Sequence, residues 1–187
     1  MITREIAQVL VAERCDFALQ RHLYYVANAM ESLCDYFGET ENKDTWYIAG
    51  LLHDIDWNDT ITHPEDHCGE ETMKYLESHG VSQQIRDCIQ AHYRELGFPM
   101  DTNMKKALFA CDELSGFIVA VALVRPTKMI GMTAKSVIKK MKTTQFAAQV
   151  SRENMRSCEE LFAIPLSEFI SLLLPGFEKI AGDWEIV

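Results

Sequence analysis

The chain has 187 residues, of which 48% are hydrophobic and 25% charged, and its formal net charge is −10. This length and composition are typical of one globular domain with a sizeable core. They exclude a membrane-spanning helix, because no apolar run approaches about 18 residues. The acidity argues against binding of long nucleic acid, which relies on many cations at phosphates.

The N-terminal sequence MITREIAQVLVAERC carries charges inside an apolar pattern and lacks the compact apolar core of a secretory signal. It therefore predicts an amphipathic first helix. The six cysteines are scattered without a CxxC pair, which favours neither a structural zinc site nor a disulfide framework. We expect reduced thiols in a cytoplasmic protein.

Apolar residues recur with a period of about 3.6 along nearly the whole chain, and no stretch alternates as a strand would. The pattern predicts an all-α, single-domain bundle of about eight or nine helices. Ser82, Thr133 and Ser151 are predicted N-caps, and Pro175 is predicted to kink or end the last helix at Leu174. The expected helices cover residues 3–14, 18–36, 44–54, 65–78, 82–94, 102–124, 133–143, 151–162 and 166–181.

The string WYIAGLLHDIDW, residues 46–57, runs through seven uncharged residues into His53 and Asp54, with a second acid at Asp56. So apolar a run predicts a buried helix, in which an unpaired carboxylate is costly. A divalent cation compensates for that cost, because imidazole and carboxylate both bind transition metals. The doublet alone is weak evidence, since an Asp at a helix end also caps a helix or faces water.

Two further histidines fall on the apolar faces of predicted helices. His22 lies along the apolar stripe of its helix, and His92 follows Ile85, Cys88 and Ile89 at the spacing i, i+3, i+4, i+7. A lone inward histidine is more often a satisfied core residue than a metal ligand. Two of them, together with a buried His-Asp doublet, favour a common metal site.

Asp112 interrupts a long apolar helix in the string ALFACDELSGFIVAVAL, residues 107–123. Ser115 and Gly116, one turn further on, are small and leave space beside its carboxylate. The neighbouring Glu113 is expected to supply the solvent-facing acid. This pattern favours Asp112 as a metal ligand over a surface acid.

A His, then a His-Asp pair, then an Asp on successive helices resembles the HD-domain superfamily of metal-dependent phosphohydrolases. The likeness covers nearly the whole chain and is greatest to small, HDIG-like bacterial and archaeal HD proteins, through strings such as HLYYVANAME, AGLLHDIDW and ACDELSGFIVA. It implies one domain over residues 1–187. A metal-binding core at about 18–124 would carry a basic helical segment, 125–187, packed on it.

The resemblance also implies one or two divalent ions of Mn, Fe, Co, Ni, Zn or Mg, bridged by Asp54. His67 is expected to be one of the ligands. His63 is the alternative, but it precedes Pro64 and is expected to be extended and exposed. Asp56 is expected either to orient a ligand histidine or to cap the third helix. The implied ligands are His22, His53, Asp54 and Asp112, with His67 and His92 added in the binuclear subset.

Residues 125–156 hold eight Lys or Arg against one acid, a local charge of +7. This segment is predicted to form a wall that receives the phosphate of a substrate, through Lys139, Lys140 and Arg152. The alternative is an ordinary solvated face.

The resemblance implies hydrolysis at phosphorus by metal-activated water. Together with the cation-rich segment and the overall acidity, it favours a small, nucleotide-like phosphate ester as substrate, with Asp54, Asp56 and Lys140 as catalytic residues. GYP does not follow the HD pair, and the pair is not part of an HDxxE or HDxxED motif. Because these motifs mark better-characterised branches of the family, their absence leaves the substrate undefined. A mixed-valent di-iron oxygenase uses the same six ligands and is the alternative. A non-catalytic module that binds metal or nucleotide is the second alternative, and homo-oligomer formation stays open.

Overall fold

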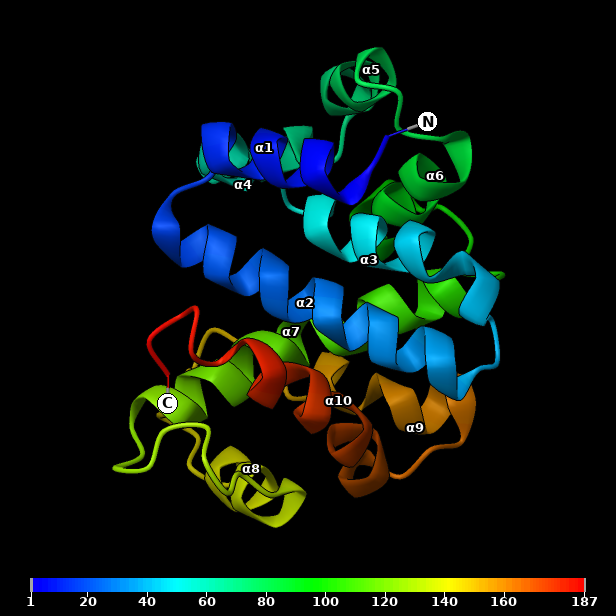
Figure 1. Ribbon diagram of the computed structural model, residues 1–187. Helices are drawn as coiled ribbons and strands as arrows, with labels where there is room; N and C mark the ends of the chain where they lie inside the picture. The colour runs from blue at the N-terminus through cyan, green and yellow to red at the C-terminus, as the bar shows by residue number, and fades with distance from the viewer. Residues whose placement is uncertain (1, 187) are drawn as a thin grey trace.

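The computed structural model describes residues 2–186, which are helical with no β-strand (Figure 1). The predicted all-α fold is confirmed. Helix α4 is a single turn of four residues, and within the described range the other nine helices are longer. The α-helices are α1 (Arg4–Arg14), α2 (Phe17–Tyr36), α3 (Lys43–Leu52), α4 (Trp57–Thr60), α5 (Glu70–Ser78), α6 (Gln83–His92), α7 (Asn103–Leu123), α8 (Ala134–Met141), α9 (Ser157–Phe162) and α10 (Leu166–Ile180).

Helix α2 runs through the centre of the bundle, with α3 packed against it on one side and α7 and α10 on the other (Figure 1). Its buried face includes Leu23 and Met30. Helix α3 comes close to α2 because Gly50 lacks a side chain: a Cβ at this position would lie 2.9 Å from the Cα of Ala27. This close approach positions His53, which follows α3 directly.

Side-chain caps define where several helices begin. Ser82 and Thr133 each accept a hydrogen bond from the backbone N–H three residues further on and cap α6 and α8, as predicted. Ser151 accepts in the same way from the N–H of Asn154. This bond holds only a turn and a short 3-10 helix, and α9 begins later than expected, at Ser157.

Pro175 lies inside α10, which continues to Ile180, so the helix end predicted at Leu174 does not occur. A proline inside a helix costs about 3 kcal/mol. The turns on both sides of it bury large side chains, including Leu173 and Phe177, and each such burial contributes about 1.5–3 kcal/mol. Core packing therefore keeps the helix together across the proline.

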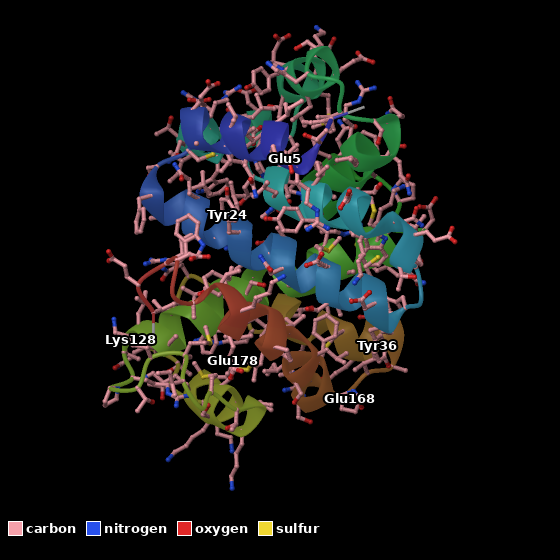
Figure 2. The ribbon with its side chains drawn as sticks, viewed as in Figure 1. Glu5, Tyr24, Tyr36, Lys128, Glu168 and Glu178 are labelled. Carbon is pink, nitrogen blue, oxygen red and sulfur yellow. The ribbon has the colours of Figure 1, made fainter. Side chains whose placement is uncertain are left out.

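The outer faces of the helices carry charged side chains such as Glu5, Glu168 and Glu178 (Figure 2). In the described part of the chain, no single helix has the length and apolar character needed to cross a membrane. The segments Asn154–Phe162 and Leu166–Ile180 meet that test only as a pair, bent by 108°.

Candidate metal centre

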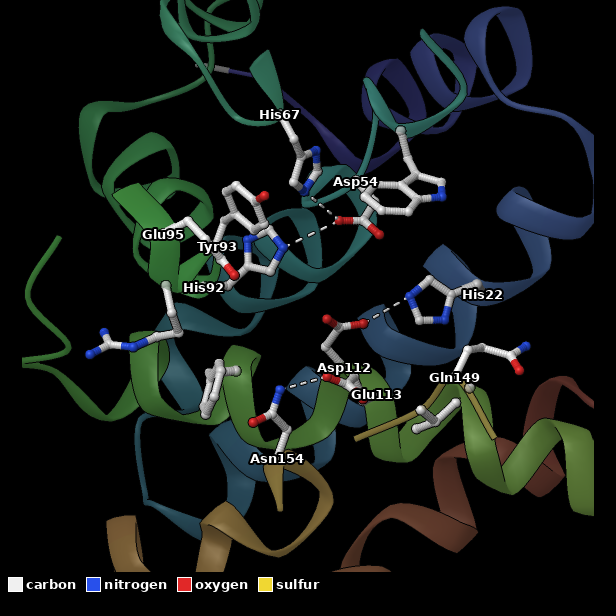
Figure 3. A pocket seen from close by; sticks show the side chains of 15 residues that line it. His22, Asp54, His67, His92, Tyr93, Glu95, Asp112, Glu113, Gln149 and Asn154 are labelled. Atoms are coloured by element: carbon white, nitrogen blue, oxygen red, sulfur yellow. Dashed lines mark hydrogen bonds and ion pairs between the residues drawn. The ribbon is translucent and has the colours of Figure 1, made fainter. Parts of the chain in front are cut away.

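The residues predicted as metal ligands come from separate parts of the chain and meet in one cluster. Five of them line a cavity (Figure 3), and His53 is fully buried beside them. Helix α2 contributes one of them, the end of α3 two, the loop before α5 one, and α6 and α7 one each. The donor atoms of four of these residues lie within 4.8 Å of one another. The four are His22, His53, Asp54 and Asp112, and the remaining two are His67 and His92.

The distances in the group of four fit a shared cation. The Nε2 atom of His22 lies 3.0 Å from Oδ1 of Asp112 and 3.3 Å from Nε2 of His53. His53 Nε2 lies 3.4 Å from Asp112 Oδ1 and 3.5 Å from Asp54 Oδ1. Two ligand atoms, each about 2.0–2.2 Å from one divalent ion, are separated by about 3–3.5 Å at common coordination angles.

Asp54 joins this group to the remaining two histidines. Its Oδ1 atom lies 3.3 Å from Nε2 of His67 and 3.2 Å from Nε2 of His92. In Figure 3 both imidazoles approach the Asp54 carboxylate, while His22 approaches that of Asp112. The Asp54 carboxylate thus lies between the two groups of candidate ligands.

Backbone carbonyls determine which ring nitrogen of two histidines carries the proton. His53 Nδ1 lies 2.8 Å from the carbonyl oxygen of Gly50, and His92 Nδ1 lies 2.5 Å from that of Ile89. A carbonyl oxygen only accepts hydrogen bonds, so each Nδ1 donates. In the neutral imidazole, Nε2 therefore presents its lone pair toward Asp54 and its neighbours, the orientation that a metal ligand needs.

His67 is oriented by Asp56. Its Nδ1 lies 2.8 Å from Asp56 Oδ1, while Asp56 Oδ2 accepts hydrogen bonds from the Cys68 N–H and the Thr72 hydroxyl at 2.8 and 2.6 Å. Among the described residues, the Asp56 side chain bonds to the loop before α5 and to α5, and not to α3, the helix that it was expected to cap. Of the two interpretations of this acid, the geometry supports orientation of a ligand histidine.

The electrostatics of the cluster balance burial against opposite charge. Burial by itself raises the pKa of Asp54, but His53 and the other imidazoles outweigh this and hold that pKa well below its usual range. Burial lowers the pKa of His67, but hydrogen bonds to Asp54 and Asp56 outweigh it and raise the pKa to about 12. Protons and a metal ion therefore compete for the same imidazole lone pairs.

The choice between His63 and His67 is decided by the loop that joins α4 and α5. The His63 side chain is 68% exposed and faces Glu65, whereas the His67 side chain is 2% exposed and lies in the cluster. Helix α5 begins at Glu70, later than predicted, because Cys68 has a φ of 54°, which an α-helix does not accommodate.

The cavity above the cluster has a volume of about 560 Å³. Among the described residues, Arg94 is the one lysine or arginine in its lining. Four carboxylates face it, and three aromatic side chains form part of its wall. The carboxylates are those of Asp54, Glu95, Asp112 and Glu113, and the aromatic residues are Trp57, Tyr93 and Phe109.

The cations predicted to receive a phosphate do not line this cavity, which is a correction to the sequence analysis. Lys139 is exposed on α8, and the Nζ atom of Lys140 lies 4.3 Å from the centre of the Phe146 ring. The guanidinium of Arg152 donates to three backbone carbonyls of its own segment. The basic segment does contribute to the wall, but through neutral side chains: Gln149, Val150 and Asn154.

Glu113 has a role in the cavity that sequence analysis missed. Its carboxylate accepts hydrogen bonds from the Ser151 N–H at 2.5 Å and the Asn154 side-chain amide at 2.6 Å, the latter drawn in Figure 3. Burial raises the pKa of this carboxyl. Glu113 thereby ties α7 to the segment that closes the cavity. The prediction that Glu113 faces solvent is therefore wrong: its side chain is half-buried. Adjacent residues on a helix point in different directions, so its place next to Asp112 gave no signal for this role.

A helical bundle with inward histidines and aspartates at the floor of one cavity defines a class of proteins suited to binding divalent metals. Residues 19–113, just over half of the chain, match the HD domain family. The chain belongs to this family, whose members are generally metal-dependent hydrolases, and the match includes all six clustered residues. Neither a curated protein nor a solved structure matches the chain.

Proposed function

We propose that this protein is a metal-dependent phosphohydrolase acting on a small phosphate ester. The observation that carries the proposal is the set of oriented imidazoles in the cluster, whose Nε2 atoms face the carboxylates of Asp54 and Asp112. Lone pairs that face carboxylate oxygens repel unless a proton or a cation lies between them. A divalent ion bound there would polarise a phosphoryl oxygen and would lower the pKa of its bound water to about 7.

The residues of the chain prepare the site before a substrate arrives. Asp56 holds the His67 ring, and the carbonyls of Gly50 and Ile89 hold those of His53 and His92. These contacts lie in buried surroundings, so little reorganisation is needed when ligands bind.

The charges of the lining support a role for metal in binding an anionic substrate. The lining has four carboxylates and one arginine, and bound metal would displace protons from its histidines. Divalent ions held there would then supply the positive charge that attracts an anion. Arg94 is exposed and forms no ion pair within residues 2–186, its guanidinium donating only to the carbonyl of Phe98 at 3.3 Å. It is the cation best placed to receive phosphate oxygens.

The size and walls of the cavity support a nucleotide-like substrate. Its volume of about 560 Å³ falls in the range of small-molecule sites, roughly 300–1,000 Å³. Trp57 and Tyr93 stand edge-on to His67, with ring centres 5.1 and 4.9 Å away. Phe109 on α7 adds a further aromatic ring to the lining, and such surfaces suit the flat ring of a base.

Metal analysis and a panel of nucleotides and other phosphate esters, assayed with Mn, Co, Ni and Mg, test this proposal. We expect metal-dependent release of phosphate. Arg94→Ala should raise KM more than it lowers kcat, with metal content intact. Lys140→Ala is the matched control, because Lys140 lies outside the cavity lining, and it should leave the kinetics unchanged.

Two outcomes of the panel would reject the proposal. Oxygen uptake without phosphate release would favour the di-iron oxygenase. Metal or nucleotide binding without turnover of either kind would indicate a non-catalytic module.

A further inference from the structure

A cysteine thiol lies at the metal centre beside the two histidines of the second group. The side chain of Cys68 is fully buried. Its Sγ lies 3.4 Å from Nε2 of His67 and 3.4 Å from the carbonyl oxygen of His53. The donor atoms of Cys68, His67 and His92 all lie within 4.8 Å of one another. Two of these residues come from the loop before α5 and one from α6.

The backbone directs this thiol into the cluster. Cys68 has a φ of 54°, a left-handed conformation that is unfavourable for a residue with a Cβ. Its N–H donates to Asp56 Oδ2, the carboxylate that also holds His67. One carboxylate thus fixes both the imidazole and the turn that carries the sulfur.

We propose that Cys68 is a thiolate ligand of the ion held by His67, His92 and Asp54. The inference rests on the proposed metal centre and adds sulfur to the donors that the sequence predicted. A sulfur about 2.3 Å and a nitrogen about 2.0–2.1 Å from one ion are separated by about 3.3–3.6 Å near tetrahedral angles. The observed 3.4 Å fits. On coordination the thiol releases its proton to solvent and gives up its bond to the His53 carbonyl.

Cys111 shows what a buried cysteine without this role looks like. It precedes Asp112 directly, but its thiol donates to the carbonyl of Leu108 within α7, at 3.6 Å. Burial raises its pKa well above the ordinary value, which keeps it a thiol. Adjacency to a ligand is therefore not sufficient, and the position of Sγ distinguishes Cys68.

A thiolate makes the two halves of the centre chemically different. The group that contains His22, His53 and Asp112 offers nitrogen and oxygen donors only, whereas the group around His67 adds a soft sulfur. Soft ligands favour zinc, cobalt and iron over magnesium and manganese. The second position is therefore selective for thiophilic metals.

Cobalt(II) added to the metal-free full-length protein tests the proposal through absorption spectra. We expect a near-ultraviolet thiolate-to-cobalt charge-transfer band together with visible d–d bands. Cys68→Ala should abolish the charge-transfer band, keep the d–d bands, and weaken zinc binding at one position by at least about 10-fold. Cys111→Ala, the matched control, should retain the charge-transfer band. Cys68→Gly serves as a second variant if Cys68→Ala does not fold, because glycine adopts a positive φ without strain.

The outcomes separate this proposal from the proposed activity. Bound cobalt without a charge-transfer band in the wild type, or a band that persists in Cys68→Ala, would overturn the thiolate ligand and leave the metal centre intact. Absence of cobalt binding would overturn both the thiolate ligand and the proposed metal-dependent activity. A Cys68-dependent band without phosphate release supports the ligand and rejects the hydrolase.

Discussion

The Nδ1 atom of His67 lies 2.8 Å from Oδ1 of Asp56, and the second carboxylate oxygen of Asp56 accepts from the Cys68 N–H and the Thr72 hydroxyl. One buried acid therefore fixes the ring of a candidate ligand, the left-handed turn that follows it and the first turn of α5. A carboxylate behind a ligand histidine sets its tautomer and raises its basicity. Asp56, the second acid of the HDID string, has the position of such a carboxylate.

Asp56→Asn should weaken metal binding about 10–100-fold, because the amide keeps the shape of the side chain but loses the charge that orients His67. A competition titration with a zinc indicator measures the effect. Thr72→Val is the matched control, since it removes one hydrogen bond to the same carboxylate without touching His67. It should lower stability by about 1 kcal/mol and leave zinc affinity nearly unchanged. Equal affinities in the two variants would contradict this role of Asp56.

His67→Ala should lower the metal content of the protein by one ion per chain, whereas His63→Ala should leave it unchanged. The reason is position: the His67 side chain is 2% exposed and faces Asp54, while that of His63 is 68% exposed outside the cluster. Elemental analysis of both purified variants, beside the wild type, measures the difference. Loss of metal from His63→Ala would show that the loop before α5 adopts another arrangement.

The stability of the metal-free protein should fall as pH rises above neutrality. Hydrogen bonds to Asp54 and Asp56 outweigh burial and raise the pKa of His67 to about 12, against about 6.5 in the unfolded chain. The stabilisation is therefore complete below about pH 6.5 and is lost progressively as pH rises toward 12. Thermal melts with a chelator across alkaline pH measure this loss.

Bound zinc should remove that alkaline loss, because the ion replaces the proton on His67. On the acid side the sign reverses. Burial raises the pKa of Asp56, but its hydrogen bonds with His67 and Thr72 outweigh this and lower it, so its stabilisation is lost as pH falls below about 4. A metal-free protein with constant stability from neutral to alkaline pH would contradict the raised pKa of His67.

Gly50→Ala should lower the melting temperature, although alanine favours a helix by about 1 kcal/mol over glycine. Its Cβ would lie 2.9 Å from the Cα of Ala27, and overpacking of this kind costs about 1–3 kcal/mol. Gly116→Ala is the matched control, because its Cβ would meet His22 Nδ1 at an ordinary 3.6 Å. It should preserve or raise the melting temperature. A more stable Gly50→Ala protein would show that α2 and α3 have room to separate.

The sequence by itself determined the all-α class, most of the helices and the inward position of His22, His53, His92 and Asp112. Helical periodicity is a local property, because residues three and four apart share a face wherever a helix forms. An apolar stripe therefore identifies the buried face without knowledge of the partner helix. The HD family match over residues 19–113 agrees with this part of the sequence analysis.

Only the tertiary structure decided what the loop before α5 and the basic segment do. The loop has no period, and its conformation at Cys68 depends on Asp56, twelve residues earlier in the chain. The cations of residues 125–156 form a run in the sequence, but Arg94, and not Lys140, lines the cavity. Charge composition does not specify direction: how α8 packs on the bundle decides which side chains face a site and which face water.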